Sequence, residues 1–173
     1  MEFVSDYVIV DIETTGLSPV NNEIIEIGAL KVVSNEIVDN FTFLIKPSIA
    51  LDENIINLTG ITNEMLVDAS DAYSVLSQFE AFIGDNVLMA HNAKFDISFL
   101  NNYYMKYLNK PLSNKYIDTL FLSRKYLKLD SYKLGNLANH FNISYVGAHR
   151  GLRDCEITKQ VYDNLLKIVH INV

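Results

Sequence analysis

Apolar residues of this chain occur in short runs in its first half, and these runs predict β-strands. Residues 7–13 (YVIVDIE) are almost continuously apolar, which is typical of a strand buried on both faces. Residues 24–33 and 37–46 predict two further strands, and the polar link at residues 34–36 indicates a hairpin between them. A fourth run, residues 86–91 (NVLMAH), predicts another short strand.

Helical spacing of apolar residues dominates the rest of the chain. The helix expected at residues 71–83 follows a Ser/Asp cap candidate, and the next one begins directly after the fourth strand. A short strand-like piece follows at residues 116–120. The helix after the fourth strand has Phe95, Phe99, Leu100 and Tyr103 on one face. Three further helices are expected, over residues 120–127, 133–140 and 150–170.

A meander of three strands followed by alternating helix and strand predicts an α/β fold, with a mixed sheet flanked by helices. The first strand is expected at the centre of the sheet, because both of its faces are apolar. Ligands of such sheets bind outside the carboxyl ends of central strands. Asp11 and Glu13 fall at that end.

The composition is that of one soluble domain covering residues 1–173. Hydrophobic residues make up 49% and charged residues 20% of the chain, and no apolar run approaches the roughly 18 residues that cross a membrane. The start, MEFVSD, lacks a signal-peptide pattern, so a cytoplasmic location without membrane contact is expected. The single Cys155 excludes an internal disulfide and a cysteine-rich zinc site.

Charge is distributed unevenly along the chain. Residues 1–101 hold 3 Lys/Arg and 16 Asp/Glu, a net of −13, whereas residues 102–173 hold 11 and 5, a net of +6. The total of −7 argues against a protein that coats nucleic acid through bulk positive charge. The asymmetry fits either an acidic metal site beside a track for a polyanion, or compositional drift on the surface.

Three short acidic segments are candidates for chemistry. Asp11 and Glu13 are two apart in a strand and therefore project to the same face. Two neighbouring anions raise each other's pKa, and a hard divalent cation is their natural partner. The alternative is that they mark an exposed strand end. Asp96, in HNAKFD, follows a strand and begins a helix, where a first-turn acid also has a purely structural role.

The third segment is HRGLRD, residues 149–154. Within one helix, His149 and Asp154 would point about 140° apart. They converge only if His149 lies in the loop before the helix and Asp154 on its second turn, and Gly147 and Gly151 are compatible with such an irregular entry. Four carboxylates around one point would need roughly two divalent ions, the arrangement used for in-line displacement at phosphorus.

Read in order, DIETTG, HNAKFD and HRGLRD resemble the three motifs of the DnaQ-like (DEDDh) 3′–5′ exonucleases. The likeness extends over most of the chain and is strongest to the proofreading domains of PolC-type DNA polymerases and of the DNA polymerase III epsilon subunit. It includes the stretch LTGIT at residues 58–62 and the segment DTL at residues 118–120. The resemblance implies a ribonuclease H-like five-stranded sheet, an antiparallel meander with added parallel strands.

The resemblance also assigns roles to residues. Asp11, Glu13, Asp96 and Asp154 match the acids that bind two divalent ions, Mg²⁺ or Mn²⁺, and His149 matches the general base of the histidine subgroup. The tyrosine subgroup has a tyrosine where this chain has Arg150. The first ion would be held by Asp11, Glu13 and Asp154, and the second by Asp11 and Asp96. The residues that match substrate-binding positions are Thr14, Thr15, Gly16, Leu58, Thr59, His91, Asn92 and Phe95.

Two further expectations concern the third motif and the basic residues. Gly151 stands where alanine is common in the family, which is expected to loosen the start of the helix without removing chemistry. From charge alone, six basic residues are candidates to guide a nucleic-acid backbone: Lys106, Arg124, Lys125, Lys128, Arg150 and Arg153.

The implied function is metal-dependent hydrolysis of single-stranded DNA from its 3′ end to 5′-mononucleotides, in proofreading or repair, with possible association with a DNA polymerase. One alternative is an exoribonuclease that trims RNA, as in RNase T or oligoribonuclease. Another is a non-catalytic docking module of a replication assembly. Replacement of the motif acids by other residues would favour this alternative. The chain ends soon after its last helix, without the tail usual in epsilon subunits, so we expect a free-standing exonuclease or a domain that associates in another way.

Overall fold

The computed structural model describes the backbone of residues 3–171 and the side chains through residue 169. A five-stranded sheet in the order β3-β2-β1-β4-β5 forms its centre, with the first strand in the middle as the apolar pattern predicts. The strands are β1 (Tyr7–Thr14), β2 (Ile24–Val33), β3 (Glu36–Leu44), β4 (Leu88–Ala90) and β5 (Tyr116–Asp118).

Strands β1, β2 and β3 are antiparallel neighbours, whereas β4 is parallel to β1 and β5 is parallel to β4. The predicted hairpin between β2 and β3 is a tight turn at Ser34 and Asn35, whose φ angles are 51° and 65°. Such turns suit the right-handed twist of the strands that they join. The predicted mixed five-stranded sheet is therefore confirmed.

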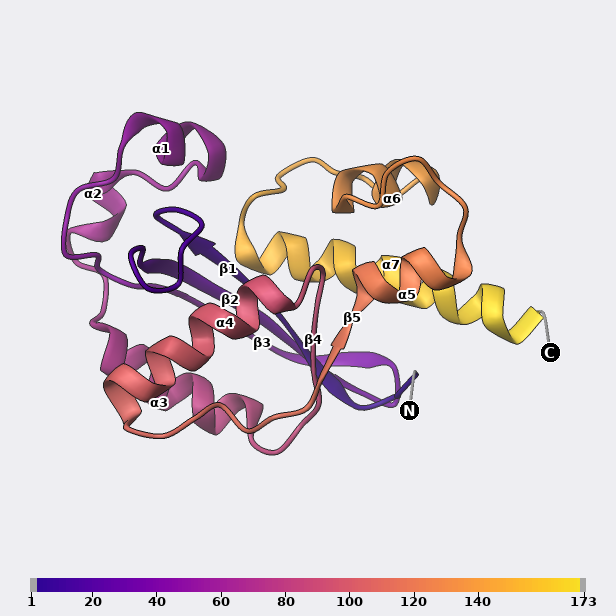
Figure 1. Cartoon of the computed structure of the whole chain (residues 1–173), viewed down its shortest axis with the longest axis horizontal. Helices are drawn as coiled ribbons and strands as arrows, with labels where there is room; N and C mark the ends of the chain where they lie inside the picture. The colour runs from indigo at the N-terminus through magenta and orange to yellow at the C-terminus, as the bar shows by residue number, and fades with distance from the viewer. Residues whose placement is uncertain (1–2, 172–173) are drawn as a thin grey trace.

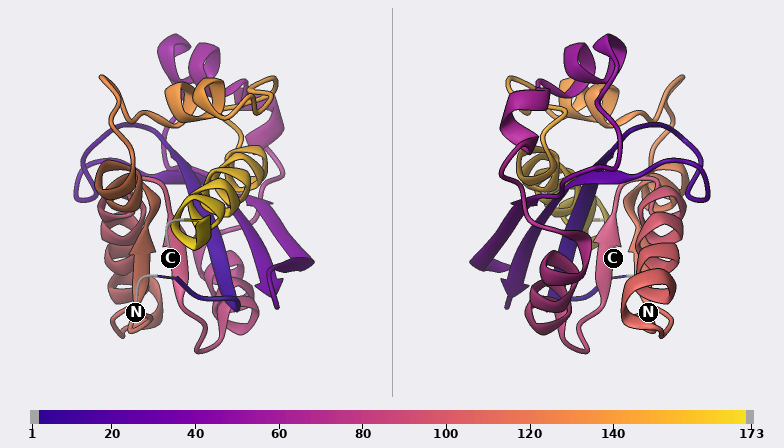
Figure 2. Two further views of the ribbon diagram at one scale, coloured as in Figure 1. Left: turned by 90° about the vertical axis from the view of Figure 1, so that its right-hand side faces the viewer. Right: turned by 90° about the vertical axis from the view of Figure 1, so that its left-hand side faces the viewer.

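Helices cover both faces of the sheet (Figures 1 and 2). Three elements differ from the sequence-based expectation: the short helices α1 and α2, which were not predicted, and the π-helical turn η1, which extends α4. The helices are α1 (Glu53–Thr59), α2 (Asn63–Leu66), α3 (Ala72–Ile83), α4 (Lys94–Tyr103), η1 (Tyr104–Leu108), α5 (Thr119–Tyr126), α6 (Leu134–His140) and α7 (Gly151–Ile171).

Alternate side chains of β1 belong to different cores. Val8 and Val10 pack with α3 and α4, while Tyr7 and Ile9 pack with α5, α6 and α7 on the other face. Because Asp11 and Glu13 continue the series of Tyr7 and Ile9, both carboxylates lie on the face that α7 covers.

Within the described residues, no helix combines the length and the apolar character needed to cross a bilayer. The long helix α7 instead packs one side on β1 and β2, with Cys155 and Tyr162 fully buried. This contact carries the start of α7 to the carboxyl end of β1, where the acids lie.

Candidate active site

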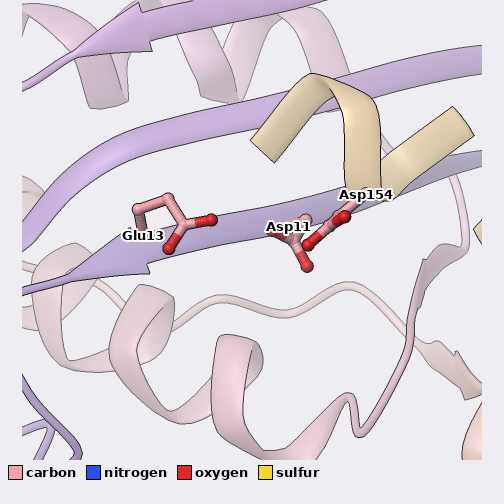
Figure 3. A group of neighbouring side chains, drawn as sticks. All are labelled: Asp11, Glu13 and Asp154. Atoms are coloured by element: carbon pink, nitrogen blue, oxygen red, sulfur yellow. The ribbon is translucent and has the colours of Figure 1, made fainter. Parts of the chain in front are cut away.

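Asp11, Glu13 and Asp154 form the centre of the candidate site (Figure 3). Asp11 and Glu13 lie near the end of β1, and Asp154 reaches them from α7. One oxygen of each carboxylate lies within 4.8 Å of the others. Asp154 is on the first turn of α7 rather than the second as expected, because the helix begins only at Gly151.

Two glycines allow α7 to approach this closely. A Cβ atom on Gly28 of β2 would lie 2.2 Å from the carbonyl carbon of Gly151. One on Gly151 would lie 2.8 Å from the Gly28 nitrogen and 3.0 Å from the Asp11 carbonyl oxygen. Gly151 therefore does not loosen the helix start; it brings the backbone of α7 against the backbone of β2.

Asp96 joins the site from the other face of the sheet. It is the third residue of α4 and is only 3% exposed. Its Oδ1 accepts a hydrogen bond of 3.2 Å from the backbone N–H of Ile12, which lies between Asp11 and Glu13. Asp96 is not one of the three acids that cluster within 4.8 Å, but its charge helps to raise the pKa of Asp11.

The acids repel one another in a poorly solvated place. Burial first, and then the charges of Asp96, Glu13 and Asp154, hold the pKa of Asp11 well above its usual range. Burial, followed by the charge of Asp154, raises the pKa of Glu13 to about 8. Burial is also the main cause that raises the pKa of Asp96 to about 8.

Asp154 shares this environment. Burial raises the pKa of Asp154, and its Oδ1 is buried without a hydrogen-bond partner among the described residues. A set of oxygen donors with excess negative charge and an unsatisfied atom fits one or more hard divalent cations.

His149 lies in the loop just before α7, as its spacing from Asp154 requires. Its backbone N–H donates a hydrogen bond of 3.3 Å to Oδ2 of Asp154. Its φ of 64° lies in the left-handed region. The exposed imidazole faces the ring of Tyr145 edge-on, with 6.0 Å between the ring centroids. The loop thus brings a titratable imidazole to the acid cluster.

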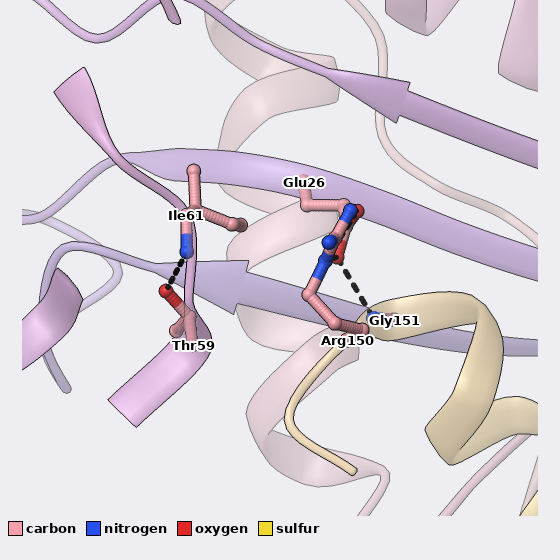
Figure 4. A network of polar contacts seen from close by, with 5 residues as sticks. All are labelled: Glu26, Thr59, Ile61, Arg150 and Gly151. Atoms are coloured by element: carbon pink, nitrogen blue, oxygen red, sulfur yellow. Dashed lines mark hydrogen bonds and ion pairs between the residues drawn. The ribbon is translucent and has the colours of Figure 1, made fainter. Parts of the chain in front are cut away.

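Glu26 is a site residue that the sequence analysis missed. It lies on β2 directly opposite Glu13 and is 1% exposed. Its carboxylate accepts hydrogen bonds from the Arg150 guanidinium and from the N–H of Gly151 (Figure 4). A signal was present, because Glu26 is the one acidic residue in a strand that is mostly apolar and almost wholly buried.

Thr14, Thr15 and Gly16 shape the turn that follows the acids. The Thr14 hydroxyl donates to the Gly16 carbonyl oxygen at 2.6 Å. The Thr15 hydroxyl accepts from the N–H of Glu23 at 2.9 Å, which closes the loop between β1 and β2. These side chains fix the backbone beside the acids, and a nucleotide-binding role for them stays a prediction.

The stretch at residues 58–62 contains the end of α1 and the turn after it. Leu58 is 54% exposed, whereas Thr59 is 4% exposed. The Thr59 hydroxyl donates to the carbonyl of Ile55 and accepts from the N–H of Ile61 (Figure 4). Leu58 is therefore the side chain of this pair that is free to contact a bound molecule.

His91 and Asn92 follow β4. The two ring nitrogens of His91 lie 2.9 Å from the Thr119 hydroxyl and 2.9 Å from the Tyr132 carbonyl oxygen, so the ring holds two segments together. Asn92 is exposed with a φ of 64°. Both residues line a cavity of about 570 Å³.

Phe95, from the same motif, is only partly exposed. Its ring packs on that of Phe99, with 5.0 Å between the centroids. It therefore contributes to the core behind the site, and a role in contacting substrate stays a prediction.

The six basic candidates are spread over the molecule. Arg153 is occupied by the carbonyls of Ser144 and Val146 and by Glu156. Arg124 lines the same cavity as His91. Lys106 lines a different cavity of about 830 Å³, which includes Thr15 but none of the four acids. A shared role along one nucleic-acid track stays a prediction.

Comparison with known proteins identifies relatives of the chain. Residues 8–162 match the family model RNase_T, described as exonuclease. The chain is 44% identical over 164 residues to a PolC-type DNA polymerase III of Halalkalibacterium halodurans, and 44% identical over 163 residues to that of Bacillus subtilis. These matches cover 94% and 93% of this chain but only 11% of each polymerase.

Solved structures show the same fold at low sequence identity. The zinc-bound complex of E. coli exonuclease I with single-stranded DNA matches 98% of this chain and 43% of that one, with a TM-score of 0.82 and 17% identity. Exonuclease X in complex with 5′-overhanging duplex DNA matches 93% and 91%, with a TM-score of 0.76 and 24% identity. The resemblance seen in the motifs is confirmed: the chain belongs to the DnaQ-like exonuclease family and is a nuclease with a ribonuclease H-like fold.

Proposed function

We propose that this chain is a metal-dependent 3′–5′ exonuclease that removes 5′-mononucleotides from single-stranded DNA ends, as one domain over residues 1–173, in proofreading or repair. The observation that carries the proposal is the convergence of Asp11, Glu13 and Asp154 with His149 at the carboxyl end of the central strand. Likeness to a region of PolC-type polymerases supports DNA as the substrate.

The acids would hold two divalent ions, Mg²⁺ or Mn²⁺. Asp11, Glu13 and Asp154 provide the ligand set for one ion, and Asp11 with Asp96 provides that for the second, directly or through water. Bound divalent ions supply positive charge for the attacking water and for the departing 3′ oxygen. The raised pKa values of these carboxyls support this assignment, because no basic side chain neutralises them fully.

His149 would act on the proton of the attacking water. A histidine side chain exchanges protons close to neutral pH, which suits a general base. Its position in the loop before α7 leaves the imidazole exposed, while its backbone N–H is bonded to Asp154. Attack at the terminal phosphodiester then yields a 5′-mononucleotide and a strand one residue shorter.

The terminal nucleotide would sit against the turn of Thr14, Thr15 and Gly16. Leu58 would pack against its base, while Thr59 supports the turn that presents Leu58. His91, Asn92 and Phe95 would line the other side of the cleft.

A 3′-labelled single strand tests the proposal. With Mg²⁺ or Mn²⁺, the chain should release labelled mononucleotide, and Asp11→Ala should abolish release. Asp85→Ala is the matched control, since this exposed acid lies before β4, at the opposite end of the sheet. Undiminished release by Asp11→Ala would exclude the proposed site.

Parallel assays on matched DNA and RNA oligonucleotides test the substrate class. We expect faster release from DNA, because the similar polymerases act in DNA synthesis by their names. Faster release from RNA would favour an RNA-trimming enzyme. Association with a DNA polymerase is a further part of the proposal, and co-purification with the PolC-type polymerase of the same cell tests it.

A further inference from the structure

Glu26 is a buried carboxylate for which the proposed chemistry has no role. It is 1% exposed and directly opposite Glu13 in the sheet. Burying a carboxylate costs free energy unless charged or hydrogen-bonding partners satisfy it. Glu26 has such partners within the protein, namely an ion pair of 2.7 Å with Arg150 and a hydrogen bond from Gly151.

All of these partners come from one short segment of the chain (Figure 4). Nε of Arg150 donates to both Glu26 oxygens at 3.2 Å, and Nη2 of Arg150 donates to Oε1 at 2.7 Å. The backbone N–H of Gly151 donates to Oε2 at 2.8 Å. A forked arginine–carboxylate pair fixes orientation as well as distance. Glu26 therefore fixes both the side chain of residue 150 and the backbone of residue 151.

The residue just before this anchor is His149. On its other side, the N–H of His149 is tied to Asp154. A φ of 64° is costly for a residue with a Cβ atom and persists only where surrounding contacts impose it. The imidazole makes no hydrogen bond to another described residue, and its ring contact is the edge-on one with Tyr145, so its direction depends largely on how the backbone is held.

We infer that Glu26 is a positioning residue: through Arg150 and Gly151, it holds the backbone that sets the direction of the His149 imidazole beside the acid cluster. Its effect on turnover rests on the proposed function. Its effect on the orientation of His149 does not, and can be measured in the metal-free protein.

The first measurement is the ring NMR signal of His149, assigned by its loss in His149→Ala. Glu26→Gln keeps an oxygen for Gly151 but removes the charge that holds Arg150. We expect the His149 signal to move toward that of a freely exposed histidine and its relaxation to show more motion, with His140 unchanged. Glu80→Gln is the control, because Glu80 forms an exposed ion pair with Lys110 at 2.7 Å. An unchanged His149 signal in Glu26→Gln would overturn the inference.

The second measurement is turnover at saturating Mn²⁺ and single-stranded DNA. Glu26→Gln should lower kcat about tenfold or more when His149 is present, because small misplacements of a reacting group are costly. In the His149→Ala background, the same change should have less than about a twofold effect. Equal losses in both backgrounds would mean that Glu26 acts only on overall structure, and would overturn the inference.

Failure of the variant to fold and absence of nuclease activity have different consequences. If Glu26→Gln does not fold, Arg150→Lys replaces it, since lysine keeps the charge but lacks the fork, and the same two measurements apply. If the unchanged chain releases no mononucleotide, the proposed function fails, while the NMR comparison still decides whether Glu26 orients His149.

Discussion

Two groups of buried carboxylates lie side by side at the end of the sheet, and their surroundings are opposite. Glu26 is neutralised within the protein by Arg150 and Gly151. Burial and the charges of the neighbouring acids raise the pKa of Asp11, and burial is the main cause that raises the pKa of Asp154. The difference distinguishes a carboxylate that holds the structure from carboxylates whose surroundings suit a bound cation.

This comparison predicts that stability and activity respond in opposite ways in the two groups. Removing a charge from the cluster of Asp11, Glu13 and Asp154 should raise the stability of the metal-free fold and abolish the proposed hydrolysis. Removing Glu26 should weaken the fold, because its partners lose a buried acceptor. Five predictions, in order of decreasing expected effect, test this contrast.

Asp11→Asn should lower mononucleotide release by roughly 10³-fold or more, the scale of losing a group that acts on transition-state charge. The same change should raise the Tm of the metal-free protein by about 2–4 °C for each kcal/mol of repulsion relieved. Thermal unfolding in EDTA measures the second effect, with Asp85→Asn as control. A fall in Tm would contradict the view that this group is under electrostatic strain.

His149→Ala should lower kcat by about 10²–10⁴-fold, the usual contribution of a general base. Binding of Mn²⁺ should stay the same, because His149 is not among the acids that form the ligand cluster. Calorimetry with Mn²⁺ measures metal binding, and a single-turnover assay measures the rate of the chemical step. Loss of metal binding together with turnover would instead make His149 a metal ligand.

Mn²⁺ affinity should rise between pH 6 and pH 8, by roughly tenfold per pH unit for each proton displaced. The carboxyls of Glu13 and Asp96 have pKa values of about 8 in the folded chain, so at lower pH the metal must displace protons from them. Titration calorimetry in buffers of different ionisation enthalpy counts these protons. A pH-independent affinity would exclude these carboxyls as ligands.

The stability of the metal-free fold should change with pH in the opposite direction to the Mn²⁺ affinity. The folded pKa values lie above the unfolded ones near 4, so these groups favour folding at low pH. That contribution is lost as the pH rises toward about 8. The Tm in EDTA should therefore fall over this range, and the increase in Tm caused by Mn²⁺ should grow.

Glu26→Ala should destabilise the chain by about 2–3 kcal/mol, less than for a fully buried ion pair because the Arg150 side chain is 42% exposed. Glu80→Ala, which breaks the exposed pair with Lys110, should cost less than about 1 kcal/mol. Urea unfolding measures both. Equal costs would remove the distinction between a carboxylate that holds the structure and an ordinary surface acid.

The sequence was most informative where local pattern and burial agree. β2 has the predicted bounds, because an apolar run and a tight polar turn define it. Helix geometry predicted the loop position of His149 on the condition that His149 and Asp154 converge. Helices α1 and α2 were missed because seven and four residues are too few to show a helical period.

Glu26 was missed for a different reason. Its partner lies 124 residues away, and no local pattern joins β2 to the start of α7. Its burial among apolar neighbours was visible in the sequence, but the meaning of that burial depended on a contact made only in three dimensions. The contact of Gly28 with Gly151 was hidden in the same way.

The packing of α7 on β1 and β2 also has a consequence for the order in which the protein is made. Asp11, Glu13 and Glu26 leave the ribosome well before His149 and Asp154, which follow much later in the sequence. Domains fold as units during synthesis. If the proposed chemistry is right, a nascent chain without α7 carries the acids of β1 but cannot cut. The growing polypeptide is then harmless to nearby nucleic acid until α7 docks on the sheet.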